Sequence, residues 1–166
     1  MKKYFSIAIL TVMMAAPMFL TSCGEDDLIP DDSQEQIIME WTEPFHTKES
    51  SVDDVKSFMA SSMKSHRLVS ETSTAENIQL AYSTSNANVG LLYSFSKLTG
   101  QLYSVIDTEL TVNSSVVIDY LQNHYSLISS DKAMLQYCFV TPDKSMVITT
   151  VKVSDTCFNI NYTFVY

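Results

Sequence analysis

The chain has 166 residues and a formal net charge of −9 at pH 7, from 19 acidic and 10 basic side chains. The acidity is uneven: residues 24–54 carry eleven Asp or Glu and one Lys, whereas residues 55–166 carry eight acidic and seven basic side chains. Because Arg67 is the only arginine and no basic stripe is present, the composition argues against nucleic acid as a partner.

The first 22 residues are predicted to be a signal peptide, since two lysines precede an almost uncharged apolar run that ends at Leu20. The next residues complete a lipobox, Leu20-Thr21-Ser22-Cys23, which resembles the cleavage signal of bacterial lipoproteins. In that class the chain is cut before the cysteine, which carries the lipid. The resemblance implies that Cys23 is lipidated and anchors the protein to a membrane, with an ordinary secretory signal and a chance cysteine as the alternative.

Residues 23–36 are predicted to form an acidic flexible tether, because they hold too little apolar surface to fold. The tether opens with Gly24-Glu25-Asp26-Asp27, which resembles the surface-export signal of Bacteroidota-type lipoproteins. This resemblance implies an outer-membrane protein that is lipid-anchored and exposed at the cell surface. The alternative is that the acidic residues only solvate the tether and that the protein faces the periplasm.

Residues 37–166 are numerous enough for a single domain with its own core. The domain begins with residues 37–45 (IIMEWTEPF), which hold Trp41, the only tryptophan. This segment is predicted to be an edge strand or an extended stretch that docks on the domain. The functional alternative is that Trp41 is an exposed aromatic contact for a ligand.

A helix is predicted to begin after Ser51, because Ser51 and Asp54 have the spacing of a capping box. Apolar residues then recur at helical spacing, namely Val52, Val55, Phe58, Met59 and Met63. After a polar stretch, three strands separated by turn residues are predicted at 76–83, 90–96 and 101–112.

The same pattern returns in residues 113–166. A second helix is predicted to open at residues 113–115, and its Val117, Tyr120, Leu121 and Tyr125 lie sixty-two positions after their counterparts in the first helix. Three further strands are predicted at 134–141, 145–153 and 156–166. The sequence therefore predicts an α+β fold of two α-β-β-β repeats (about 51–112 and 113–166), forming an antiparallel sheet with two helices packed on one face. Tandem units of this kind resemble the beta-lactamase inhibitor protein fold in topology alone, so no inhibitor residue is carried over.

Cys138 and Cys157 are the only cysteines besides Cys23, and an exported protein with an even pair allows a disulfide. They fall, however, on the first and third strands of a predicted three-stranded meander. Such strands are about 9.5 Å apart, whereas a disulfide needs Cα atoms within about 7 Å. The two cysteines are therefore predicted to be free and buried, with the disulfide as the alternative.

No catalytic, metal or cofactor constellation is predicted. His46, His66 and His124 are isolated and lack the spacing of metal ligands. Asp107 and Glu109 share one strand face and could bind a cation or, less often, serve acid–base chemistry, but an exposed edge-strand face is the favoured interpretation. An enzyme is therefore not expected.

The sequence favours a lipid-anchored cell-envelope lipoprotein that acts as a non-catalytic protein-interaction module, with an envelope or surface protein as its partner. The alternative is a glycan-binding accessory lipoprotein of a surface nutrient-uptake system, in which Trp41 and the tyrosines would stack on sugars. A small hydrolase is a third hypothesis, for which no serine or aspartate is a preferred candidate.

Overall fold

The structure is a computed structural model that describes residues 38 and 40–165. The predicted signal peptide, Cys23 and the predicted tether lie outside the described residues. The residues that are described all belong to one compact unit of the chain.

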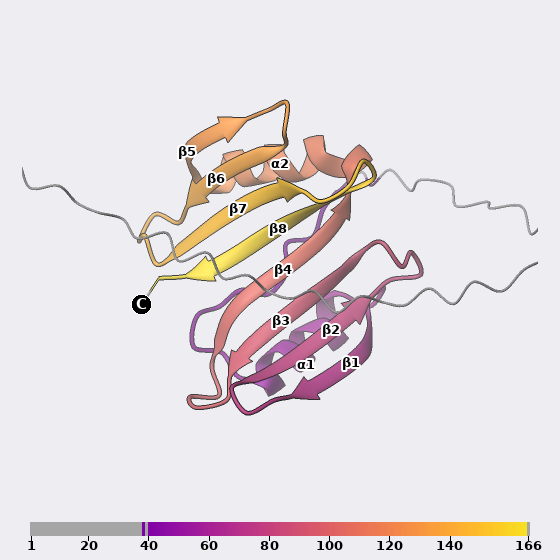
Figure 1. The fold of residues 1–166 in the computed structure, drawn as a ribbon, viewed down its shortest axis with the longest axis vertical. Coiled ribbons are helices and arrows are strands. Elements are labelled where there is room, and N and C mark those ends of the chain that lie inside the picture. Colours follow the sequence, from indigo (N-terminus) through magenta and orange to yellow (C-terminus); the bar gives the residue numbers. More distant parts are fainter. Residues whose placement is uncertain (1–37, 39, 166) are drawn as a thin grey trace, which may run out of the picture. The chain divides into compact units, whose positions relative to one another are not determined.

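Two helices and eight strands make up this unit (Figure 1). In chain order they are α1 Val52–Ser62, β1 Arg67–Ser73, β2 Asn77–Ser83, β3 Gly90–Ser96, β4 Leu102–Leu110, α2 Ser114–His124, β5 Ser126–Asp131, β6 Gln136–Val140, β7 Met146–Lys152 and β8 Cys157–Phe164, with a 3-10 turn at Thr111–Asn113 before α2. The strands form a single antiparallel sheet in the order β1-β2-β3-β4-β8-β7-β6-β5. The prediction of an antiparallel sheet accompanied by two helices is therefore confirmed.

The predicted number of strands is wrong, because β1 and β5 lie outside the six predicted strand ranges. Every residue of both strands is exposed, so neither has the half-buried alternation that identifies a strand in sequence. A β-bulge also interrupts each strand, at Val69 in β1 and at Ile128 in β5. Each helix is consequently followed by four strands rather than three, and β4 and β8 become the central strands.

The start of α1 is held by the predicted capping box. Ser51 Oγ accepts a hydrogen bond from the Asp54 backbone N–H at 3.3 Å, and Asp54 Oδ2 accepts one from the Ser51 N–H at 2.8 Å. In contrast, Asn113 makes no side-chain cap at the start of α2. Its Oδ1 instead accepts the backbone N–H of Ile38 at 3.1 Å, so this side chain fastens the beginning of the described chain to the turn before α2.

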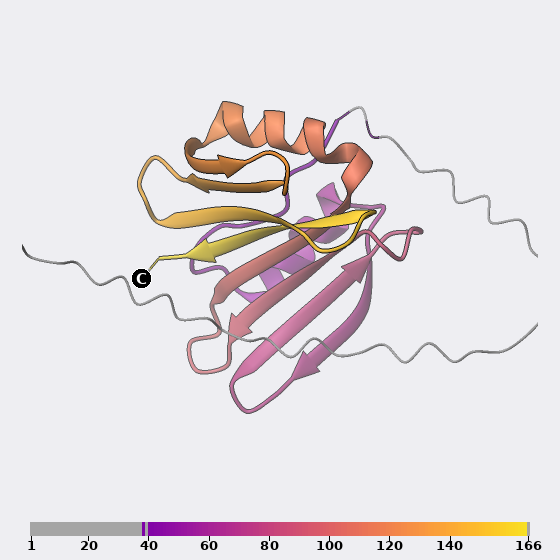
Figure 2. The same cartoon turned by 45° about the horizontal axis from the view of Figure 1, so that its top comes forward.

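The core lies between the sheet and the helices, which are on the same side of the sheet in Figure 1 and in the turned view of Figure 2. Side chains that are neighbours across six strands form its centre, and each of them is fully buried: Leu80, Tyr93, Val105, Tyr162, Ile148 and Phe139. Val55 of α1 and Leu121 of α2 are also fully buried in this core. The last strand alternates between the two faces of the sheet, because Phe158, Ile160 and Tyr162 are all 0 % exposed and the residues between them are not buried.

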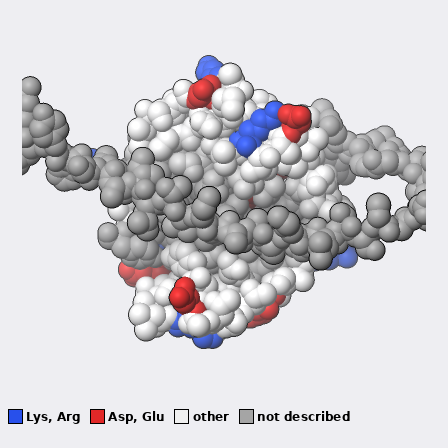
Figure 3. Space-filling model, viewed as in Figure 1, with Lys and Arg blue, Asp and Glu red and all other residues white. Residues whose placement is uncertain are grey.

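The opposite face of the sheet carries no charged side chain on the six inner strands. Its central row, read across neighbouring strands, is Ala81, Leu92, Ile106, Asn161, Thr149 and Cys138. The adjacent rows contain serine, threonine, asparagine, glutamine and aliphatic residues. Figure 3 shows this side of the molecule, with the visible Lys, Arg, Asp and Glu toward its margins.

Candidate functional site: sheet edges and a buried carboxylate pair

The two edges of the sheet expose apolar side chains at equivalent positions. Beside the bulge of β1, Leu68 is 44 % and Val69 is 64 % exposed, and beside the bulge of β5, Leu127 is 46 % and Ile128 is 61 % exposed. Edge strands also carry backbone groups that no neighbouring strand pairs, so they are sites where another extended chain can add.

The two edges differ in charge. Strand β1 contains Arg67 and Glu71, and Lys56 Nζ of α1 donates to Glu71 Oε2 at 2.8 Å. Such charges protect an edge from pairing with another chain. The edge of β5 has no charged residue before Asp131 at its end, and so it is the less protected edge of the sheet.

A second feature is a pair of buried carboxylates on the helix side of β4. Asp107 is 2 % exposed and Glu109 is 7 % exposed. The expectation that this pair lies on an exposed edge-strand face is wrong, because β4 pairs with both β3 and β8 in the middle of the sheet. Residues two apart on a strand point to the same face, which here is the face that packs against the core.

The chain between residues 40 and 48, hereafter the strap, brings Trp41 to this pair. The strap is extended but is not a strand, and Trp41 is 5 % exposed, as expected of a segment that docks on the domain. Trp41 Nε1 donates a hydrogen bond to Asp107 Oδ2 at 3.2 Å. The indole also meets Tyr120 of α2 edge to face, with ring centroids 5.1 Å apart. Trp41 is therefore not an exposed aromatic platform.

Both carboxylates hold protons more tightly than ordinary carboxylates do. Burial, and then the nearby charge of Glu109, raise the pKa of Asp107 well above its usual value. Burial raises the pKa of Glu109 to about 7. Hydrogen bonds from the Asn113 side chain and the Leu110 backbone lower this pKa, but the effect of burial is larger. Within the described chain, neither carboxylate forms an ion pair with a lysine, arginine or histidine.

Glu109 also lines a cavity of about 240 Å³, hereafter the Glu109 pocket. Its walls come from the strap, the end of α1, the β2–β3 loop and the end of β4; they include Trp41, Ser62, Ser65, His66 and Asn113. The buried Nε2 atom of His66 has no hydrogen-bond partner among the described residues. Burial lowers the pKa of His66, so its ring is neutral at pH 7.

Beyond Trp41, the strap places a third carboxylate among tyrosines. Glu43 accepts hydrogen bonds from the hydroxyls of Tyr125 at 2.7 Å, Tyr120 at 3.1 Å and Tyr162 at 3.3 Å. His46 stacks on Tyr162, with ring centroids 5.1 Å apart, and its Nε2 lies 3.2 Å from the Tyr125 hydroxyl. Sequence reasoning missed this cluster, because its members are up to 119 positions apart and no local pattern links them.

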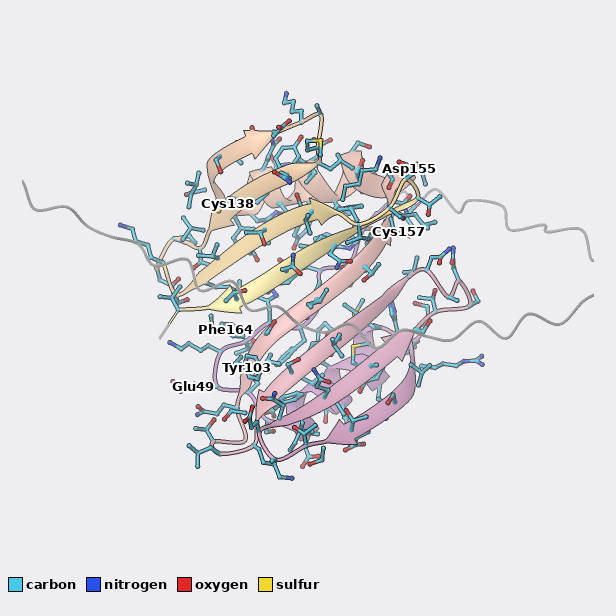
Figure 4. The ribbon with its side chains drawn as sticks, viewed as in Figure 1. Glu49, Tyr103, Cys138, Asp155, Cys157 and Phe164 are labelled. Carbon is cyan, nitrogen blue, oxygen red and sulfur yellow. The ribbon has the colours of Figure 1, made fainter. Side chains whose placement is uncertain are left out.

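The remaining candidates are structural. Cys138 on β6 and Cys157 on β8 are free, with β7 between them, as predicted (Figure 4). Cys157 is buried but Cys138 is only half-buried, so the expectation that both are buried is partly wrong. His124 is exposed and stacks on Tyr120 at 4.0 Å. No group of three or more His, Cys, Asp or Glu in the described residues is arranged to hold a metal ion.

Comparison of the chain with protein-family models, curated proteins and solved structures found no match in any of the three. In the described part of the chain, neither helix has the length and apolar character that crossing a membrane requires.

Proposed function

We propose that the protein is a lipid-anchored lipoprotein of the cell envelope that acts as a non-catalytic protein-interaction module. Its partner is an envelope or surface protein that adds an extended segment to the β5 edge. The observation that carries this proposal is the edge itself: six exposed residues, uncharged up to Asp131, with Leu127 and Ile128 projecting beside a bulge. Main-chain hydrogen bonds would supply affinity there, and the two apolar side chains would supply selectivity.

The proposed location in the cell envelope rests on the sequence, namely on the lipobox that ends at Cys23. Lipid on Cys23 would anchor the mature chain at the outer membrane, with the domain exposed at the cell surface. If residues 23–36 form the predicted flexible tether, these fourteen residues would span about 20 Å on average. That reach would let the domain meet partners beside its anchor.

An internal repeat is the second part of the proposal. It is supported by the element order, in which a helix and four strands occur twice, and by the equivalent bulges at Val69 and Ile128. In a repeated fold, β1 and β5 are corresponding strands. The charges on β1 would then protect that edge from pairing, whereas β5, which is uncharged up to Asp131, would be the edge that binds the partner.

No observation favours the glycan-binding alternative. The aromatic residues on which it depends are buried on the core side: Trp41 is 5 %, Tyr82 is 6 %, and Tyr93 and Tyr162 are 0 % exposed. Sugars stack on exposed rings, which these residues do not provide.

Photocrosslinking in intact cells that produce the full-length chain tests the proposal. A photoreactive amino acid replaces Ile128, and matched positions are Val69 on the other edge and Leu98, which is 94 % exposed in the β3–β4 turn. We expect one protein to be crosslinked from position 128 and not from 69 or 98. We also expect Ser129→Lys to remove that crosslink, because a charge protects an edge. Equal crosslinking from all three positions, or a crosslink that survives Ser129→Lys, would contradict binding at the β5 edge.

A further inference from the structure

We propose that the Glu109 pocket binds a small organic cation, with the ammonium group of the ligand against Glu109 and its body along Trp41. This binding site is separate from the β5 edge and does not depend on the function proposed above. Four features of the pocket carry the inference: its size, its charge, its unsatisfied polar atom and its aromatic wall.

The size restricts the ligand to a small molecule. Sites for drug-sized ligands are about 300–1,000 Å³, and the pocket is about 240 Å³. Since a water molecule takes about 30 Å³ of the liquid, the pocket holds the equivalent of about eight waters. A short amine fits this space, whereas a peptide or an oligosaccharide does not.

The charge of the pocket calls for a positive ligand. Glu109 and Glu40 are among the lining residues, which include no lysine or arginine. A buried carboxylate without a cationic partner is costly, and a ligand ammonium would provide the missing charge.

Besides Glu109, the pocket is lined by a histidine and a tryptophan that could contact an ammonium ligand. His66 lines the same pocket with a neutral ring, and its buried Nε2 has no hydrogen-bond partner among the described residues. Trp41 lines the same pocket, and aromatic walls attract organic cations. The described residues offer no three-ligand set for a metal ion, so the pocket favours an organic cation over a metal.

The only tryptophan of the chain lines the pocket, so its fluorescence reports occupancy directly. The full-length chain in detergent is titrated with n-butylamine, and with n-butanol and butyrate as neutral and anionic compounds of the same skeleton. We expect a saturable change in Trp41 fluorescence with butylamine, and no such change with butanol or butyrate. We expect Glu109→Gln to weaken the apparent affinity about tenfold or more, since it removes the charge at nearly constant shape.

Asp155→Asn is the matched control, because Asp155 is an exposed carboxylate in the β7–β8 turn (Figure 4). It should leave the titration unchanged. The same response to butanol as to butylamine, no saturable response to butylamine, or an unchanged affinity in folded Glu109→Gln would overturn the proposal. The comparison of the three compounds uses the wild-type chain, so the test stands even if Glu109→Gln fails to fold.

Discussion

Trp41 and Asp107 are 66 positions apart in the chain, and one hydrogen bond of 3.2 Å joins them. Through this bond the strap is attached to the centre of the sheet, at a carboxylate that is 2 % exposed. A buried acceptor depends on its donors, because an unpaired polar group away from water is costly. The position of the strap and the protonation state of Asp107 therefore depend on each other.

Trp41→Phe should destabilise the protein, since it keeps an aromatic ring in place but removes the N–H that Asp107 accepts. We expect a loss of about 1–3 kcal/mol in the free energy of unfolding at pH 8, measured by denaturant titration. In an Asp107→Asn background the same substitution should cost less, because the neutral amide depends less on that donor. Equal costs in the two backgrounds would show that the lost energy comes from ring packing alone.

The buried carboxylates make stability depend on pH. Glu109 binds its proton more tightly in the folded state, with its pKa raised from 4.5 to about 7. Its contribution to stability is therefore fully present below pH 4.5 and is lost as the pH rises to 7 and above. A shift of this size corresponds to about 3 kcal/mol, and Asp107, whose pKa is also raised, acts in the same direction.

His66 works in the opposite direction, because its lowered pKa reduces stability as the pH falls below 6.5. The measurement is therefore a difference: the unfolding free energy of the wild-type chain minus that of Glu109→Gln, from pH 4.5 to 8. We expect this difference to fall as the pH rises. A constant difference would mean that Glu109 titrates alike in the folded and unfolded states. Glu71→Gln, at an exposed position, is the matched control.

Much of the fold could be predicted from local patterns. The capping box of Ser51 and Asp54 indicates the start of α1, and alternation identifies strands such as β8, whose Phe158, Ile160 and Tyr162 face the core. Strands β1 and β5 could not be predicted in this way. Every residue in them is exposed and a bulge breaks their register, so the hydrophobic pattern that identifies a strand is absent.

The candidate pocket could be predicted only in pieces. Trp41 and the pair of Asp107 and Glu109 stand out in the sequence, but whether they meet depends on which strands are neighbours. Pairing of β4 with β8 turns an expected edge into the centre of the sheet. That pairing joins the two halves of the chain, and no local sequence signal specifies it.

Gly90, the first residue of β3, and Gly100, in the β3–β4 turn, should respond differently to alanine. At Gly90 an added Cβ would lie 2.5 Å from the backbone oxygen of Tyr82, whereas at Gly100 it would meet nothing within 4 Å. Gly100 does have φ +72°, which strains an alanine by about 1–2 kcal/mol. We expect Gly90→Ala to cost more, about 3 kcal/mol, because a strand must shift to relieve the overlap. Thermal unfolding of the two variants measures the two losses of stability. An equal or smaller loss in Gly90→Ala than in Gly100→Ala would contradict the close approach of Gly90 to the Tyr82 backbone.

The predicted lipid anchor can be tested by replacing Cys23, whose sulfur atom would carry the lipid. If Cys23 accepts a lipid, cells fed an alkyne-labelled fatty acid should label the wild-type chain, and Cys23→Ser should abolish the label. Cleavage before Cys23 should also fail, leaving a chain that is larger by the 22 residues of the signal peptide. Cys138→Ser is the matched control, because Cys138 is a free cysteine in the folded domain. It should keep both the label and the cleavage. A label that survives in Cys23→Ser would place the acyl group elsewhere, and normal cleavage without a label would identify an ordinary secretory signal.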